Sequence, residues 1–125
     1  MLRAMKRPEI PNPDTAGRLA RATFSRAFMS DTKWRKLIAA VCAARKDVSC
    51  MTVQFIDAAD VRQMGFPPGL SCPWPYIDTI EFGPVELRSI EWMEFDADLT
   101  DLLDPIGKFL VELHGGRTRI VGYLA

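Results

Sequence analysis

The sequence predicts an α+β fold with the element order ααβββαββ, in which a mainly antiparallel sheet of about five strands carries helices on one face. Three observations lead to this prediction. Apolar residues recur at helical spacing in two stretches before residue 45. From Ser49 the apolar period changes to two, as in half-buried strands. Gly115-Gly116 then separates two strand-like runs, which is a hairpin signal and favours antiparallel pairing.

The length of 125 residues indicates one domain, large enough to bury about two-thirds of its unfolded surface without a metal or a disulfide. Prolines and charged residues dominate residues 1–12, which we expect to form a flexible arm. Residues 13–125 are predicted to form the single α+β domain.

Two amphipathic helices are predicted in the front part of the chain. The first begins with Asn12 as N-cap and Pro13 in the first helical position, and its apolar positions run to Phe28. Ser30 or Asp31 caps the second helix. Its predicted buried stripe is Trp34, Leu37, Ile38, Val41 and Cys42. The tight connection favours an antiparallel helix pair.

Strands follow the helices. Met51, Val53 and Phe55 alternate with polar residues and predict a half-buried strand. After a long connection over 58–75, strands are expected over 76–82 and 85–95, with Gly83-Pro84 as the turn between them. The apolar phase of the second strand changes near residues 88–89, which predicts either a bulge or a central strand covered on both faces. A short helix is expected over 96–104.

The hairpin over 108–124 has a defined predicted register, because a two-residue turn at Gly115-Gly116 places His114 opposite Arg117. Glu112 then opposes Arg119 and forms a complementary cross-strand pair. The same register continues through Leu113–Thr118, Val111–Ile120 and Leu110–Val121, and it places the Phe109 ring over Gly122.

Charge is divided unevenly along the chain, although the formal net charge is zero. Residues 1–48 carry 11 Lys and Arg against 4 Asp and Glu, whereas residues 49–125 carry 5 against 12. This asymmetry raises the expectation of a charged partner. Nucleic-acid binding through the basic front helices is one alternative, with Arg26, Lys33, Arg35 and Lys36 among the candidate phosphate contacts.

Several classes of function are disfavoured by the sequence. No apolar run approaches the ~20 residues of a membrane span, and prolines replace the apolar core of a signal peptide. Three cysteines without paired spacing fit a reducing compartment, so we expect a cytoplasmic protein. No Gly-rich phosphate loop is present, and we predict no cofactor.

No catalytic or metal-binding residues are predicted. The single histidine, His114, falls beside a hairpin turn, and Cys72 has no cationic neighbour that would activate its thiol. The acidic run 96–101 resembles a calcium loop but lacks its glycine and closing glutamate, so helix capping explains it. A small enzyme that uses Cys72 or His114 remains an alternative.

The long connection over 58–75 is the strongest functional candidate, because loops of that length in compact domains are uncommon and often bind partners. Trp and Tyr are enriched among interface residues that dominate affinity. The alternative is that its aromatic residues fold back and cap the core. The candidate protein-binding residues are Trp74, Tyr76, Glu91, Trp92 and Glu94.

Four short motifs resemble a family of small uncharacterised bacterial proteins: Asp31-Thr-Lys-Trp-Arg-Lys-Leu37, Phe82-Gly-Pro84, Ile90-Glu-Trp92 and Ile120-Val-Gly-Tyr123. The resemblance spans roughly residues 12–124 and is structural, so it implies no activity and no site residues. By analogy of class, small acidic bacterial α+β proteins without an active site are often immunity proteins that neutralise a toxin.

The function predicted from the sequence is therefore a non-enzymatic protein-binding module, of which a bacterial immunity protein is the most concrete form. In this hypothesis an acidic, aromatic-containing surface meets a basic surface on a protein partner. The sequence predicts no membrane association and leaves the oligomeric state open.

Overall fold

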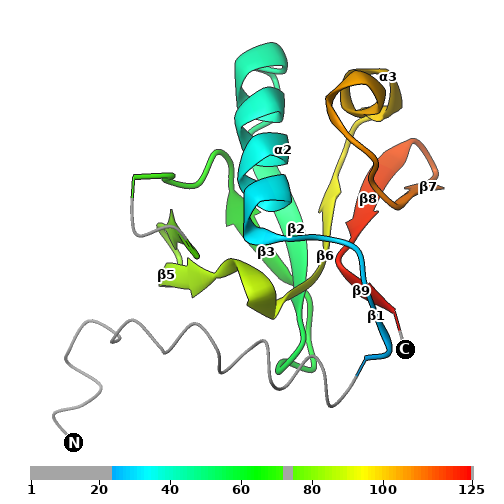
Figure 1. Ribbon diagram of the computed structural model, residues 1–125. Coiled ribbons are helices and arrows are strands. Elements are labelled where there is room, and N and C mark those ends of the chain that lie inside the picture. Colours follow the sequence, from blue (N-terminus) through cyan, green and yellow to red (C-terminus); the bar gives the residue numbers. More distant parts are fainter. Residues whose placement is uncertain (1–23, 72–74, 125) are drawn as a thin grey trace, which may run out of the picture.

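The computed structural model describes residues 24–71 and 75–124. Its centre is a five-stranded antiparallel sheet in the order β3-β2-β6-β8-β7, and helix α2 (Asp31–Ala44) packs across one face of that sheet (Figure 1). The prediction of an α+β fold with a mainly antiparallel sheet of five strands is confirmed. The strands are β2 (Cys50–Phe55), β3 (Arg62–Gly65), β6 (Ile90–Phe95), β7 (Val111–His114) and β8 (Arg117–Val121).

Smaller elements flank this sheet. A separate hairpin of β4 (Tyr76–Thr79) and β5 (Gly83–Glu86) leads through a 3-10 turn (Leu87–Ser89) into β6. The short helix α3 (Thr100–Leu103) runs into a second 3-10 turn (Asp104–Ile106). Strand β1 (Arg26–Ala27) pairs with β9 (Tyr123–Leu124), so the first and last described segments lie side by side.

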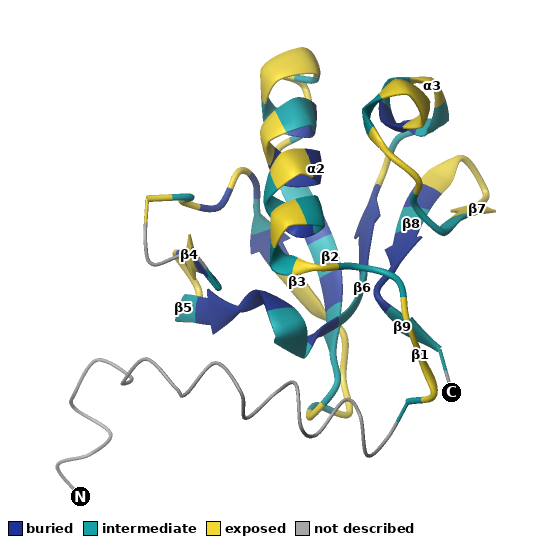
Figure 2. Ribbon diagram, in the orientation of Figure 1, coloured by how far each residue is buried: buried dark blue, intermediate teal, exposed yellow. Residues whose placement is uncertain are grey.

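Helix α2 forms where the sequence places it. Ser30 is the N-cap, and its side chain accepts a hydrogen bond of 3.1 Å from the backbone N–H of Lys33. Four residues of the predicted stripe are buried against the sheet, namely Trp34, Leu37, Ile38 and Val41, while Cys42 is partly buried beside them. Figure 2 shows this buried stripe on α2 facing the buried positions of the strands.

The core lies between α2 and the sheet. Val53 of β2 stands directly opposite Met93 of β6, and Met93 stands opposite Ile120 of β8, so all three point to the same face. All three are fully buried in the main apolar cluster, together with residues of α2. Neighbouring positions on these strands therefore point to the opposite face of the sheet, away from the helix.

The predicted first helix is wrong at its C-terminal end, and its residues 13–23 lie outside the described residues. Phe24 to Phe28 are not helical, because Arg26 and Ala27 form the strand β1. The Phe24 ring stacks on Tyr123 with 5.4 Å between the ring centroids. A contact with the end of the chain has therefore overridden the local apolar spacing.

The long strand predicted over 85–95 is interrupted. The 3-10 turn Leu87–Ser89 divides it at the point where the apolar phase changes, so Leu87 and Ile90 can both enter the core. The turn predicted at Gly83-Pro84 lies earlier, at residues 80–82, and both residues belong to β5. The predicted long connection contains an unpredicted strand, β3, which pairs with β2.

The C-terminal hairpin has the predicted register, from His114–Arg117 to Val111–Ile120. A backbone hydrogen bond of 2.9 Å from Val121 N to Leu110 O extends it by one residue. The predicted packing of Phe109 over Gly122 is wrong. The Phe109 ring lies against Gly107 instead, because the carbonyl oxygens of Ile90 and Glu91 occupy the space beside Gly122.

Candidate functional site

Two of the predicted site residues lie on the sheet face that turns away from α2. Trp92 and Glu94 are two residues apart on β6, so they share a face, and Met93 between them points into the core. Cross-strand partners extend this polar face: Glu94 stands opposite Thr52 on one side and Arg119 on the other, and Arg119 stands opposite Glu112.

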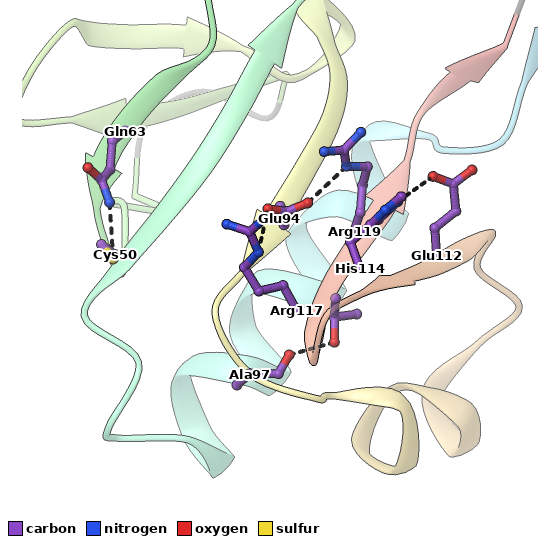
Figure 3. A network of polar contacts seen from close by, with 9 residues as sticks. Cys50, Gln63, Glu94, Ala97, Glu112, His114, Arg117 and Arg119 are labelled. Atoms are coloured by element: carbon purple, nitrogen blue, oxygen red, sulfur yellow. Dashed lines mark hydrogen bonds and ion pairs between the residues drawn. The ribbon is translucent and has the colours of Figure 1, made fainter.

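Glu94 is buried and paired with two arginines. Its residue surface is 5% exposed, and its carboxylate oxygens lie 2.9 Å from Arg119 Nε and 3.5 Å from Arg117 Nε (Figure 3). The guanidinium carbon of Arg119 also lies 3.7 Å from the centroid of the Trp92 ring, a close cation–π contact. This cluster compensates the charge of Glu94 within the chain.

A second polar pair lies at the edge of the same face. Glu112 Oε1 and His114 Nε2 are 3.0 Å apart on β7, and both side chains are nearly half exposed (Figure 3). Such an open position leaves the His114 ring in contact with solvent rather than enclosed around a bound substrate. The alternative enzyme based on His114 therefore gains no pocket from this arrangement, and Cys72 lies outside the described residues.

The remaining candidates occupy different positions. Tyr76 is 2% exposed, and burial together with the nearby Glu86 carboxylate raises the pKa of its phenol. Glu91 is partly buried, and Trp74 lies outside the described residues. In the described part of the long connection, Phe66 is buried, and its ring packs edge-on against Phe95 with 5.3 Å between the ring centroids. This contact favours the alternative in which the connection covers the core.

Basic residues near α2 have structural partners. Lys33 Nζ donates to the carbonyl of Phe28 at 3.0 Å, and Arg35 donates to the carbonyls of Leu70 and Tyr76. The guanidinium of Arg26 lies 4.9 Å from the Phe28 ring centroid. These contacts account for three of the front-half cations without a phosphate ligand.

A surface that the sequence did not predict lies at the tip of the β4–β5 hairpin, which we call the hairpin tip (residues 79–83). Ile80 is 96% exposed and Phe82 is 40% exposed, and Glu81 stands between them. Two apolar residues inside a tight turn were the available signal, because turns are normally polar.

The hairpin tip is held in one shape despite this exposure. Thr79 Oγ1 donates to the carbonyl of Gly83 at 2.9 Å and accepts from the backbone N–H of Phe82 at 3.0 Å. Glu81 Oε2 accepts from the backbone N–H of Gly65 at 3.0 Å, which ties the tip to the end of β3. We conclude that the tip presents its apolar residues from a fixed backbone.

The surroundings of the hairpin tip are acidic. The Phe82 ring packs edge-on against Phe55 at 6.5 Å, which joins residues 55–62 to residues 78–83. These two segments contain four acidic side chains and one basic one, Arg62, whose guanidinium lies 5.9 Å from the Phe82 centroid. The acidic residues, all exposed, are Asp57, Asp60, Asp78 and Glu81.

No family model matches the chain, and comparisons with curated proteins and with solved structures found no match. The resemblance to a bacterial family therefore stays a prediction. Within residues 24–71 and 75–124, no three His, Cys, Asp or Glu side chains gather as a metal site would require. Over the same residues, no helix has the length and apolar character needed to cross a bilayer.

Proposed function

We propose that this chain is a non-enzymatic protein-binding module and that the hairpin tip is its contact surface. The observation that carries the proposal is the position of Ile80, which is 96% exposed at the end of a hairpin held by Thr79 and Glu81. Burial of such a side chain is worth about 1.5–3 kcal/mol. A partner that covers Ile80 would gain this free energy with little loss of backbone entropy, because the tip is already ordered.

The chemistry around the hairpin tip defines the kind of partner. An exposed apolar side chain next to Glu81, on a tip whose Phe82 contacts a segment that carries Asp57 and Asp60, fits a protein that has an apolar pocket with Lys and Arg at its rim. A toxin whose active site binds a polyanionic substrate has a rim of this kind. The immunity-type role predicted from the sequence is the form of the proposal that we favour.

The surface differs from the one expected at first, since Glu94 is enclosed by arginines and Tyr76 is buried. Its acidic and aromatic character is the same, but Glu81 and Phe82 supply it. Trp92 and Arg119 form a cation–π pair on the sheet face that turns away from α2 and take no part in this contact surface.

The test compares affinity capture by three immobilised baits from a lysate of the source organism, quantified by mass spectrometry. The baits are the wild type, the variant Ile80→Ser and the variant Glu81→Lys. We expect a protein enriched by the wild type to be depleted at least about tenfold with each variant, because the first loses apolar contact and the second reverses charge. Its binding should also weaken as salt is raised.

The matched control is Leu113→Ser, which removes another exposed aliphatic side chain, 53% exposed, on the edge strand β7 away from β3. This bait should capture the same protein as the wild type. Equal capture by the Ile80→Ser bait, or loss of capture with Leu113→Ser alone, would refute the hairpin tip as the contact surface. The proposal would also be refuted if every captured protein bound the wild-type and Ile80→Ser baits equally.

A further inference from the structure

Among the described residues, strand β7 has a free edge, because the sheet order β3-β2-β6-β8-β7 places it last. An edge strand exposes a row of backbone N–H and C=O groups that can pair with another strand. On β7 the one large aliphatic side chain near the turn, Leu113, is 53% exposed. This edge lies apart from the hairpin tip and takes no part in the function proposed above.

The turn determines which backbone groups face outward. Gly115 and Gly116 both have positive φ angles, of 61° and 84°, as a two-residue type I′ hairpin turn requires. In such a turn the residues that flank the loop, His114 and Arg117, are joined by hydrogen bonds between their backbone N–H and C=O groups. The direction of the backbone hydrogen bonds alternates along a strand. The N–H and C=O groups of His114 and Glu112 therefore point to β8, whereas those of Leu113 and Val111 point to the free edge.

We propose that two copies of this chain associate through antiparallel pairing of their β7 strands, with the two-fold axis at Leu113. The backbone N–H and C=O groups of each Leu113 would then form hydrogen bonds with those of Leu113 in the second copy. The two leucine side chains would be in contact. The two five-stranded sheets would join into one continuous sheet across the axis.

Hydrogen bonding between Glu112 and His114 selects this register among those that the backbone allows. The two-fold axis of an antiparallel pair can pass through a hydrogen-bonded or a non-hydrogen-bonded pair, so every residue of β7 is a possible centre. Centring on Glu112 would place two glutamates opposite each other, whereas centring on Val111 or His114 would leave Glu112 opposite Leu110 or Gly116. Centring on Leu113 places Glu112 directly opposite His114 of the second copy, and the reverse pair completes a complementary set. Within one chain these two side chains already approach to 3.0 Å, so both lie on the same face in reach of the axis.

The strand is short, so the interface is small and the dimer should be reversible, with a population that rises with concentration. Analytical ultracentrifugation of the full chain from about 1 µM to 1 mM should show mass increasing toward twice the 14.1 kDa of one chain. The variant Leu113→Lys should stay monomeric, because it places two like charges on the axis. Ile80→Lys, an equally drastic change at the exposed hairpin tip, should dimerise like the wild type.

A cysteine experiment tests the register itself. In the proposed pair the two Leu113 Cα atoms are about 5.5 Å apart, within disulfide range. Leu113→Cys should therefore form a cross-linked dimer under oxidised glutathione. Glu112→Cys is the matched control, because the two residues 112 are offset by two positions along the paired strands. Their Cα atoms are more than about 7 Å apart, which is beyond disulfide range. The wild type, with its native cysteines, provides the background.

A chain that is monomeric at 1 mM would overturn the proposal, and so would cross-linking of Glu112→Cys as fast as Leu113→Cys. A dimer that survives Leu113→Lys but is lost with Ile80→Lys would also overturn it and would place the interface at the hairpin tip. Because the capture experiment uses Ile80 and this one uses Leu113, failure of one proposal is distinguishable from failure of the other.

Discussion

Gly122 is enclosed by backbone rather than by flexible side chains. A Cβ atom at this position would stand 2.7 Å from the carbonyl oxygen of Ile90 and 3.0 Å from that of Glu91. The Trp34 ring lies 3.3 Å away on the helix side. Gly122 also donates a hydrogen bond of 2.7 Å to Glu91 and accepts one of 2.8 Å from Phe28, so the strand cannot move aside without losing these bonds.

We predict that Gly122→Ala lowers the free energy of unfolding by about 1–3 kcal/mol, because its methyl group overlaps fixed carbonyl oxygens. Urea unfolding followed by circular dichroism measures this change. The matched control is Gly65→Ala, whose new Cβ would meet only Glu81 Oε2 at an ordinary 3.7 Å. The control should be near neutral, and a loss as large as that of Gly122→Ala would contradict the steric explanation.

At the residue scale, the sequence predicts apolar burial more reliably than the environment of a charged group. Trp34, Ile38 and Val41 are buried as their spacing requires. Glu94 was expected on an open acidic surface, yet the pairing of β6 with β8 brings Arg119 directly opposite it. That pairing joins residues 25 apart, and nothing near Glu94 in the sequence indicates it.

At the scale of elements, local signals identify α2 and the C-terminal hairpin. Ser30 caps the helix and two glycines set the turn, so each element is specified by residues within or beside it. Strand β3 and the end of the first predicted helix were not predicted correctly. Both depend on distant partners, namely β2 for β3, and β9 for β1. The hairpin tip was missed for a related reason, because its exposure is a property of the folded hairpin.

The N-terminal turn of α2 contains a partly buried carboxylate, Asp31, whose charged form is disfavoured by burial. Burial raises the pKa of Asp31 above its ordinary value of 3.8, and the nearby Arg88 and Arg35 oppose this effect only in part. Arg88 Nε lies 3.6 Å from Asp31 Oδ2, while the buried Oδ1 has no hydrogen-bond partner among the described residues. The native state therefore binds a proton at Asp31 more tightly than the unfolded chain does.

This raised pKa predicts a pH-dependent effect of Asp31→Asn. The contribution of Asp31 to stability is fully present below pH 3.8 and is lost as pH rises through the raised pKa, because the native state must then carry a buried charge. The stability of Asp31→Asn relative to the wild type should therefore increase between pH 3 and pH 7. Urea unfolding of both proteins across this range measures it, and a relative stability that falls with pH would show the opposite linkage.

At the scale of the whole molecule, β6 is the central strand and pairs with β2 on one side and β8 on the other. These pairings join residues far apart in the chain, and the sequence alone did not predict their order. The uneven charge along the chain has no simple counterpart in the fold. Asp31 of the basic front half pairs with Arg88 of the acidic back half, and Lys33 and Arg35 bond to backbone carbonyls.

Hydrogen exchange should follow this sheet order. At protein concentrations near 1 µM, where we expect a monomer, backbone amides of β6 should exchange most slowly among the described strands. The outward-facing amides of Val111 and Leu113 on β7 should exchange at least roughly tenfold faster. Exchange measured by mass spectrometry tests this ranking. Equal protection of β6 and β7 would contradict the position of β7 at a free edge.

The pairing of β1 with β9 has a mechanical consequence. Arg26 lies opposite Leu124, so tension applied to the chain on either side of the domain would act at the same end of this two-stranded ladder. The hydrogen bonds between β1 and β9 would then break one after another. They would not be loaded together, as they are when two strands are pulled in shear. The five central strands would carry no load until β1 and β9 had separated, so a weak pull would detach these two strands and leave the core intact.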